Sequence, residues 1–265
     1  MMLFFISLSA FAIRFQPYSF YPIQFDAIVT SEDFRDASAL QCFVDSVPSG
    51  SVIGFRGGVY TGESLVLRQP ITLAAIKGDS PVVFVHNAAF GHQTACLIVS
   101  ADDEAYSTSL WGIHFSSRID GDAYGMELGH ALSLVRGACL AVDCSFRSYA
   151  GSSIRIHKVD DPAFLHMKYC DISSGYRNGI MVEGGQGLYL DGCFIACNQG
   201  HGVFLESGAA ISAARSTISH NGGMGIAGVV QDICIVQSFV EHNERACPLE
   251  SGWPELPEQA QESVD

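Results

Sequence analysis

The 265-residue chain is short of basic side chains. It has 14 Lys and Arg residues against 28 Asp and Glu residues, which gives a formal net charge of −14. A nucleic-acid-binding protein normally carries a basic patch, so this shortage argues against nucleic acid as a partner. Such a surface would also repel an acidic polysaccharide. We interpret the negative charge as what keeps a chain with 48% hydrophobic residues in solution.

Several short motifs of metal, nucleotide and hydrolase chemistry are also missing. The sequence contains no CxxC pair, no P-loop, no GxSxG and no HExxH. Nine cysteines are present, but the spacings of Cys139 with Cys144 and of Cys193 with Cys197 do not fit a zinc knuckle. We therefore expect no metal and no other cofactor, and we interpret most cysteines as small buried side chains.

The N-terminal segment, residues 1–29, opens with the apolar run MMLFFISLSAFA. This run resembles a signal peptide, but it is short and lacks a basic start. It is also too short to span a bilayer, so we expect no transmembrane segment. Cleavage as a signal peptide and burial as a capping strand both stay open. Because the chain has no Asn-x-Ser/Thr sequon, we expect a reduced protein of the cytoplasm or nucleus, with secretion as the alternative.

A repeat of 22 to 26 residues runs through the second half of the chain. Each unit has a small residue, then an apolar residue two positions later, then another apolar residue eight positions after that. The small residues are Cys144, Cys170, Cys193, Ser216 and Ser238; the apolar ones are Phe146, Ile172, Ile195, Ile218 and Val240, and then Ile154, Ile180, Val203 and Ile226. The pattern predicts three short strands per unit, separated by turns, with alternate residues facing inward.

One turn of the repeat carries Asn198, Asn221 and Asn243, with Gly175 one unit earlier. Asn and Gly both tolerate left-handed backbone, so we expect that conformation at these positions. Stacked Asn side chains could also hydrogen-bond along the axis of the repeat. The unit is too short for an ankyrin or tetratricopeptide repeat, and it lacks the LxxLxL pattern of a leucine-rich repeat.

The first half of the chain carries less regular copies of the repeat, and its opening segments resemble those of a known family. Residues 30–47 are predicted to form a short amphipathic helix, with Thr30 as N-cap and Asp33 at the capping-box position. After it come GSVIGFRGGVY at residues 50–60 and PITL at residues 70–73. This run resembles the opening of pectate-lyase-like β-helices, and the later repeats resemble those of polysaccharide-active β-helices and β-helical F-box proteins. We therefore expect an all-β, single-stranded right-handed parallel β-helix over residues 30–248, capped at its N-terminal end by the helix.

Two fragments imitate a polygalacturonase-type catalytic set. Gly200-His201-Gly202 resembles the GHG motif of that family, and Arg155 opens a segment that resembles R-I-K. The NTD segment is missing, the Arg element precedes the GHG instead of following it, and Asp160-Asp161 falls in a predicted turn. We assign no catalytic residue.

An acidic cluster of the kind that holds calcium in pectate lyases is the other candidate. Asp120, Asp122 and Glu127 lie in an insertion after Phe115. We interpret them as a solvated loop, because loops on the protein surface commonly carry such residues. We assign no metal-binding residue.

The alternation that assigns inward residues also assigns outward ones. On the third strand of successive units these are Arg155, Met181, Phe204 and Ala227, and on the neighbouring strands they are Tyr189, Phe194 and Phe239. An Arg, a Met and an aromatic residue in one column have the composition of an interface core. The same side chains could stack on a sugar ring. We predict binding residues at Arg155, Met181, Phe204, Tyr189 and Phe194; the alternative is that a loop or the C-terminal tail covers the column.

Residues 249–265 form an acidic, Pro-rich tail that we expect to be disordered, with Trp253 either capping the last unit or serving as a short linear motif. A complete structural repeat beside an incomplete catalytic set favours a non-catalytic binding or scaffold module for a protein or carbohydrate ligand. The alternatives are a carbohydrate-active enzyme, either a polysaccharide lyase or a glycoside hydrolase, and the substrate-recognition part of a larger adaptor.

Overall fold

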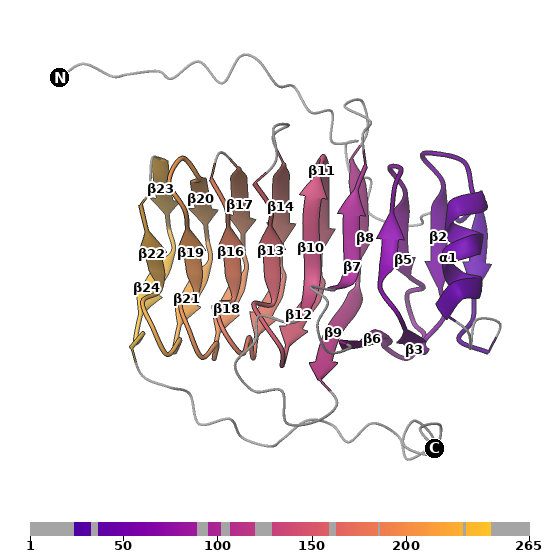
Figure 1. Cartoon of the computed structure of the whole chain (residues 1–265), viewed down its shortest axis with the longest axis horizontal. Helices are drawn as coiled ribbons and strands as arrows, with labels where there is room; N and C mark the ends of the chain where they lie inside the picture. The colour runs from indigo at the N-terminus through magenta and orange to yellow at the C-terminus, as the bar shows by residue number, and fades with distance from the viewer. Residues whose placement is uncertain are drawn as a thin grey trace.

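The protein is a right-handed parallel β-helix, seen in a computed structural model as strands stacked coil upon coil along one axis (Figure 1). The structure describes residues 24–32, 37–88, 95–101, 107–119, 129–158, 163–184, 186–229 and 232–244. Within them lie three parallel sheets of nine, eight and seven strands, here called sheets A, B and C. The predicted fold class is confirmed.

Each coil contributes one strand to sheet A, then one to sheet B, then one to sheet C. Sheet A consists of β1 (Ala27–Val29), β2 (Val52–Phe55), β5 (Thr72–Ala75), β8 (Thr108–Trp111), β11 (Ala138–Val142), β14 (Phe164–Lys168), β17 (Gly187–Asp191), β20 (Ala210–Ala214) and β23 (Asp232–Val236). Sheet B consists of β3 (Gly58–Gly62), β6 (Val82–Ala88), β9 (Ile113–Ile119), β12 (Ser145–Ser148), β15 (Asp171–Ser173), β18 (Phe194–Ala196), β21 (Thr217–Ser219) and β24 (Phe239–Glu241). Sheet C consists of β4 (Leu65–Leu67), β7 (Ala95–Ser100), β10 (His130–Arg136), β13 (Ile154–Ile156), β16 (Ile180–Val182), β19 (Val203–Leu205) and β22 (Ile226–Gly228).

The core is a set of columns of inward side chains, one rung per coil. In sheet B the column begins with stacked rings, in which the centroids of Phe84 and Phe115 lie 5.5 Å apart and those of Phe115 and Phe146 lie 5.4 Å apart. Ile172 and Ile195 continue it and are fully buried. The predicted inward positions of the regular coils are confirmed.

The predicted column of small residues lies at the corner between sheets A and B. Cys144, Cys170, Cys193 and Ser216 are buried there. Backbone N–H groups reach along the column: that of Cys193 donates to Ser216 Oγ at 3.1 Å, and that of Ser216 donates to Ser238 Oγ at 3.0 Å. The corner therefore selects side chains that are small, whether thiol or hydroxyl.

The predicted asparagine ladder is present at the turn after sheet B. Asn198 Nδ2 donates to Asn221 Oδ1, and Asn221 Nδ2 donates to Asn243 Oδ1, both at 2.9 Å. The left-handed backbone lies one residue earlier, with φ of 56° at Cys197 and 55° at His220. The prediction of left-handed backbone at the asparagines is therefore wrong: these positions need the Asn side chain, which bonds buried backbone groups of two coils.

Among the residues that the structure describes, one short helix, α1 (Ala37–Ser46), covers the N-terminal end of the stack (Figure 1). Leu40 and Val44 point into the core. Gln41 Oε1 accepts the backbone N–H of Val66 at 2.7 Å while its Nε2 donates to the Val66 carbonyl at 2.9 Å, so Gln41 pairs with the edge of β4 as a strand would. The predicted cap is confirmed as a helix.

The start of the helix differs from the prediction. Thr30 does not begin a helix, because residues 27–29 form β1, the first strand of sheet A, and Ser31 and Glu32 then form a turn. Asp33 lies outside the described residues. None of the helices described is long and apolar enough to cross a membrane.

Candidate functional site

The predicted outward column lies on sheet C. Arg155 pairs in register with Met181, Met181 with Phe204 and Phe204 with Ala227 across β13, β16, β19 and β22. The side chains of Arg155, Met181 and Phe204 are half-buried. Because neighbouring strands lie about 4.8 Å apart, these three side chains form one continuous strip.

The other two predicted binding residues lie on other faces. Tyr189 is on sheet A, 38% exposed, with its ring centroid 6.2 Å from that of His166. Phe194 is on sheet B, 47% exposed, in a column with Thr217 and Phe239. The structure therefore brings together three of the five residues, and Tyr189 and Phe194 do not share their surface.

One end of the strip is charged and internally bonded. Arg155 donates to Glu183 Oε1 from Nη2 at 2.6 Å and from Nε at 2.7 Å, and both side chains are only 14% exposed. Glu183 Oε2 also accepts the backbone N–H of Lys158 at 2.8 Å. Beside this pair, Ser133 Oγ and His157 Nε2 lie 2.7 Å apart.

The hydrogen bonds of Glu183 decide its charge state. Burial acts to raise the pKa of Glu183, but the Lys158 N–H and the Arg155 guanidinium outweigh it, so the pKa is lowered overall. Glu183 is therefore a carboxylate near neutral pH, and Arg155 is held against it in a fixed orientation.

The other end of the strip is aromatic. The His201 ring stacks on Phe204 with centroids 5.7 Å apart and planes 25° apart. His201 Nδ1 accepts the backbone N–H of Met224 at 2.9 Å, and the Met224 side chain is 52% exposed beside it. We call Arg155, Met181, Phe204, His201 and Met224 the sheet C patch.

Two members of this patch were not predicted as binding residues. His201 and Met224 occupy equivalent turn positions, each preceding a sheet C strand by the same interval, as Asn178 does one coil earlier. Their shared position in the repeat is the signal that the sequence offers. Strand alternation does not extend into the turn, so it did not predict whether these side chains point inward or outward.

The residues that imitate a catalytic set have structural partners. His201 uses Nδ1 to hold the turn, and its backbone N–H donates to Asn178 Oδ1 at 2.9 Å. Arg155 is bound to Glu183. In the part of the chain that the structure describes, no three His, Cys, Asp or Glu side chains gather to hold a metal ion. The acidic residues Asp120, Asp122, Glu127, Asp160 and Asp161 lie outside the described residues.

Comparisons with known proteins place the fold. A family model described as "Right handed beta helix region" matches residues 130–250. The solved structure of pectate lyase Pel9A superposes with a TM-score of 0.55 at 14% identity, over 76% of this chain and 55% of that one. The pectin methylesterase from Aspergillus niger gives a TM-score of 0.47 at 12% identity, over 89% of this chain and 93% of that one. No curated protein matches the sequence.

These similarities concern the architecture. This chain spans about 55% of the length of the pectate lyase, and at 14% identity the shared feature is the β-helix itself.

Proposed function

We propose that this protein is a non-catalytic binding or scaffold module that holds a protein or carbohydrate ligand on the sheet C patch. The observation that carries the proposal is the registered strip of Arg155, Met181 and Phe204 on three adjacent strands. Aromatic, Met and Arg side chains are enriched in interfaces relative to the rest of a protein surface.

The patch is organised before any ligand arrives. Arg155 is held by two bonds to Glu183, and Phe204 is held by the His201 ring. Side chains that are already ordered lose little conformational entropy on binding, which favours affinity. The three strands that carry these side chains, β13, β16 and β19, are paired with one another in sheet C.

The bonding of the patch supports binding over catalysis. The Arg155 guanidinium uses Nη2 and Nε as donors to Glu183, so it is held in a structural contact. His201 Nδ1 is occupied by a backbone amide. The alternative function is a polysaccharide lyase or glycoside hydrolase, and the observation that favours it is the fold shared with pectate lyase Pel9A. With a net charge of −14, we expect a neutral glycan to be preferred over an acidic one.

The test replaces Met181 and Phe204 by Ser together and measures binding and thermal unfolding. Binding is measured to immobilised neutral and acidic polysaccharides and by protein capture. Loss of binding with an unchanged melting temperature supports the proposal. A large fall in melting temperature would show instead that Met181 and Phe204 are part of the packed core and not of a binding surface. The matched control is Tyr189→Ser, an exposed aromatic on another sheet, which should retain binding.

The enzyme alternative is tested on the unaltered chain. Polysaccharides are incubated with and without calcium, and reaction products are measured. Turnover that disappears in Asp122→Ala or His201→Ala would overturn the proposal in favour of a lyase or hydrolase.

We also propose that the protein works with reduced thiols in the cytoplasm or nucleus, as the binding part of a larger adaptor or alone. The column of Cys144, Cys170 and Cys193, which are buried and pack as small core side chains, supports this. Thiol counting under denaturing, non-reducing conditions tests it: several native disulfides, or an N-terminus near Ile13, would favour secretion.

A further inference from the structure

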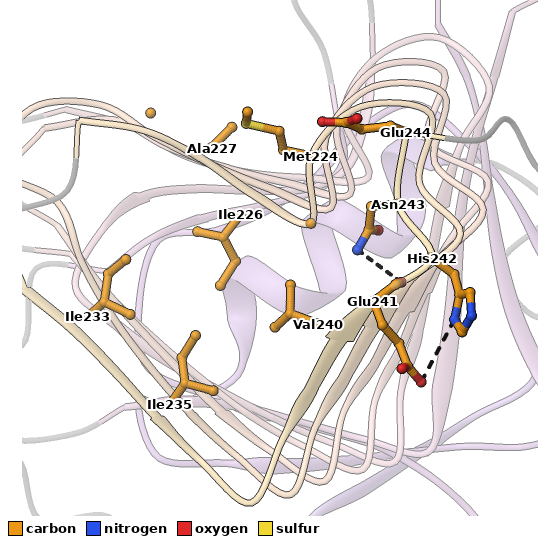
Figure 2. A pocket seen from close by; sticks show the side chains of 12 residues that line it. Met224, Ile226, Ala227, Ile233, Ile235, Val240, Glu241, His242, Asn243 and Glu244 are labelled. Atoms are coloured by element: carbon orange, nitrogen blue, oxygen red, sulfur yellow. Dashed lines mark hydrogen bonds and ion pairs between the residues drawn. The ribbon is translucent and has the colours of Figure 1, made fainter.

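We infer that the C-terminal end of the β-helix is closed by the segment of this chain that follows Glu244, with Trp253 seated in the hollow of the last coil. The inference does not depend on the sheet C patch, although Met224 belongs to both surfaces. It concerns a second surface, at the end of the solenoid (Figure 2).

The hollow is formed by the core positions of the last coil. It has a volume of about 460 Å³, and Figure 2 shows Ile226, Ile233, Ile235 and Val240 around it. Ile233, Ile235 and Val240 are 49%, 40% and 41% exposed, whereas their counterparts one coil earlier, Ile211, Ala213 and Ile218, are buried. These side chains continue buried columns, and the end face therefore needs an apolar cover.

The two ends of the solenoid differ in how their backbone edges are completed. At the N-terminal end Gln41 pairs with both polar groups of Val66. At the other end β22, β23 and β24 are the last strands of their sheets. Ser238 and Asn243 each accept a backbone N–H from the preceding coil, but within the described residues their own N–H groups meet no equivalent side chain. Unpaired edges of this kind favour pairing with further chain.

The following segment is within reach and has suitable side chains. Glu244 lines the hollow, and Trp253 follows nine residues later, which spans at most about 30 Å when extended. Trp253 offers one large apolar side chain, with Leu249 and Leu256 on either side of it. Pro248, Pro254 and Pro257 cannot donate ladder hydrogen bonds, so the segment would fill the hollow with side chains instead of adding a regular coil.

Charge favours this segment over a second copy of the protein. Glu241 and Glu244 lie at the hollow, so two end faces meeting about a two-fold axis would bring these carboxylates together. Residues 245–256 carry one base, Arg245, and two acids, Glu250 and Glu255, so this segment adds a net charge of −1, less than the two carboxylates that a second end face would bring.

The experiment uses the full chain in a Trp111→Phe background, so that Trp253 is the remaining indole. We expect Trp253 to emit as a buried indole and to be shielded from acrylamide. Ile235→Lys places a charge in the hollow and should shift the emission to the red with loss of shielding. Val229→Lys is the matched control, because Val229 is exposed in the same coil but does not line the hollow; it should change neither signal.

A second variant guards against misfolding of Ile235→Lys. Trp253→Ser leaves the described residues unchanged and should speed amide hydrogen exchange in β23 by about tenfold, without changing exchange in β14. A hydrated Trp253 in the Trp111→Phe background, with no further substitution, overturns the inference. The inference is also overturned if the mass of the protein in solution doubles as its concentration rises while β23 is protected from hydrogen exchange. That result would show that a second copy covers the end face.

Discussion

Arg155 and Glu183 are joined across neighbouring coils on sheet C, with Nη2 and Oε1 2.6 Å apart and both side chains 14% exposed. The two residues are 28 positions apart, so no local sequence pattern predicts that they form a pair. The pair fixes the guanidinium next to Met181 and so orders the polar end of the proposed patch.

Removing one partner of this pair should destabilise the protein measurably. We expect Glu183→Ala to lower the free energy of unfolding by about 2 kcal/mol, because it leaves a poorly exposed guanidinium and the Lys158 N–H without their acceptor. Because the pKa of Glu183 is lowered on folding from 4.5, its contribution is complete above that pH and is lost as the pH falls through the lowered pKa. Denaturant unfolding at several pH values measures both effects.

The exposed pair of Arg68 and Asp45 provides the control for that prediction. Its side chains are 60% and 44% exposed, so Asp45→Ala should change the free energy of unfolding by no more than about 0.5 kcal/mol. Equal losses in Glu183→Ala and Asp45→Ala would contradict the role assigned to burial.

The asparagine ladder should be most sensitive at its middle rung. Asn221 is fully buried; its Oδ1 accepts both the side-chain and the backbone N–H of Asn198, and its Nδ2 donates to Asn243 Oδ1. We expect Asn221→Ala to lower the free energy of unfolding by about 3 kcal/mol, because it leaves buried N–H donors of the neighbouring coil without an acceptor. Asn243→Ala, at the half-buried end of the ladder, should lower the free energy of unfolding by less. Differential scanning calorimetry of the two variants measures the difference.

The sequence predicted the features that recur in the regular coils of the second half of the chain. The columns of Cys170 and Ile172 and the ladder of Asn198 followed from a period of about 23 residues, because each rung must fit the same corner. Left-handed backbone at this turn had no such signal, because different residue types, Ser174, Cys197 and His220, adopt it in successive coils.

Other features depended on long-range packing. The helix begins at Ala37 because residues 27–29 join sheet A, a pairing with β2 that no local pattern specifies. Strand alternation placed Tyr189 and Phe194 outward, as found, but did not indicate that they face away from the strip of Phe204 on separate sheets. The contribution of His201 to the patch depends on a turn conformation that strand alternation does not describe.

His130 should make the protein less stable in mild acid. It is 2% exposed, and its Nδ1–H donates to the Ser152 carbonyl at 2.9 Å. Burial chiefly lowers its pKa to about 4, against 6.5 when unfolded, so between these values the unfolded chain binds a proton that the folded chain does not. Stability is therefore complete above pH 6.5 and falls on acidification, by about 2 kcal/mol at pH 5 from this group alone.

The measurement compares His130→Gln with the unaltered chain by denaturant unfolding at pH 7 and pH 5. Burial also lowers the pKa values of His86, His114 and His166, so the unaltered chain should lose more than this one contribution. His130→Gln should lose correspondingly less stability between the two pH values. An identical loss in His130→Gln would remove His130 from the acid response.

The column at the corner of sheets A and B should tolerate a hydroxyl in place of a thiol but not a larger side chain. Cys193 is 2% exposed and stacks on Ser216, whose Oγ accepts the Cys193 N–H at 3.1 Å. In Cys193→Ser the new Oγ can accept the N–H of Cys170 in the same way, so we expect a change in the free energy of unfolding below about 1 kcal/mol. Cys193→Leu should instead lower it by about 1–3 kcal/mol, because the added carbons meet a close-packed corner. Thermal and urea unfolding of the two variants measure the difference, with Cys234→Leu on the exposed face of β23 as the matched control. A tolerated Leu at Cys193 would show that the corner does not select for size, and the recurrence of Cys and Ser there would need another cause.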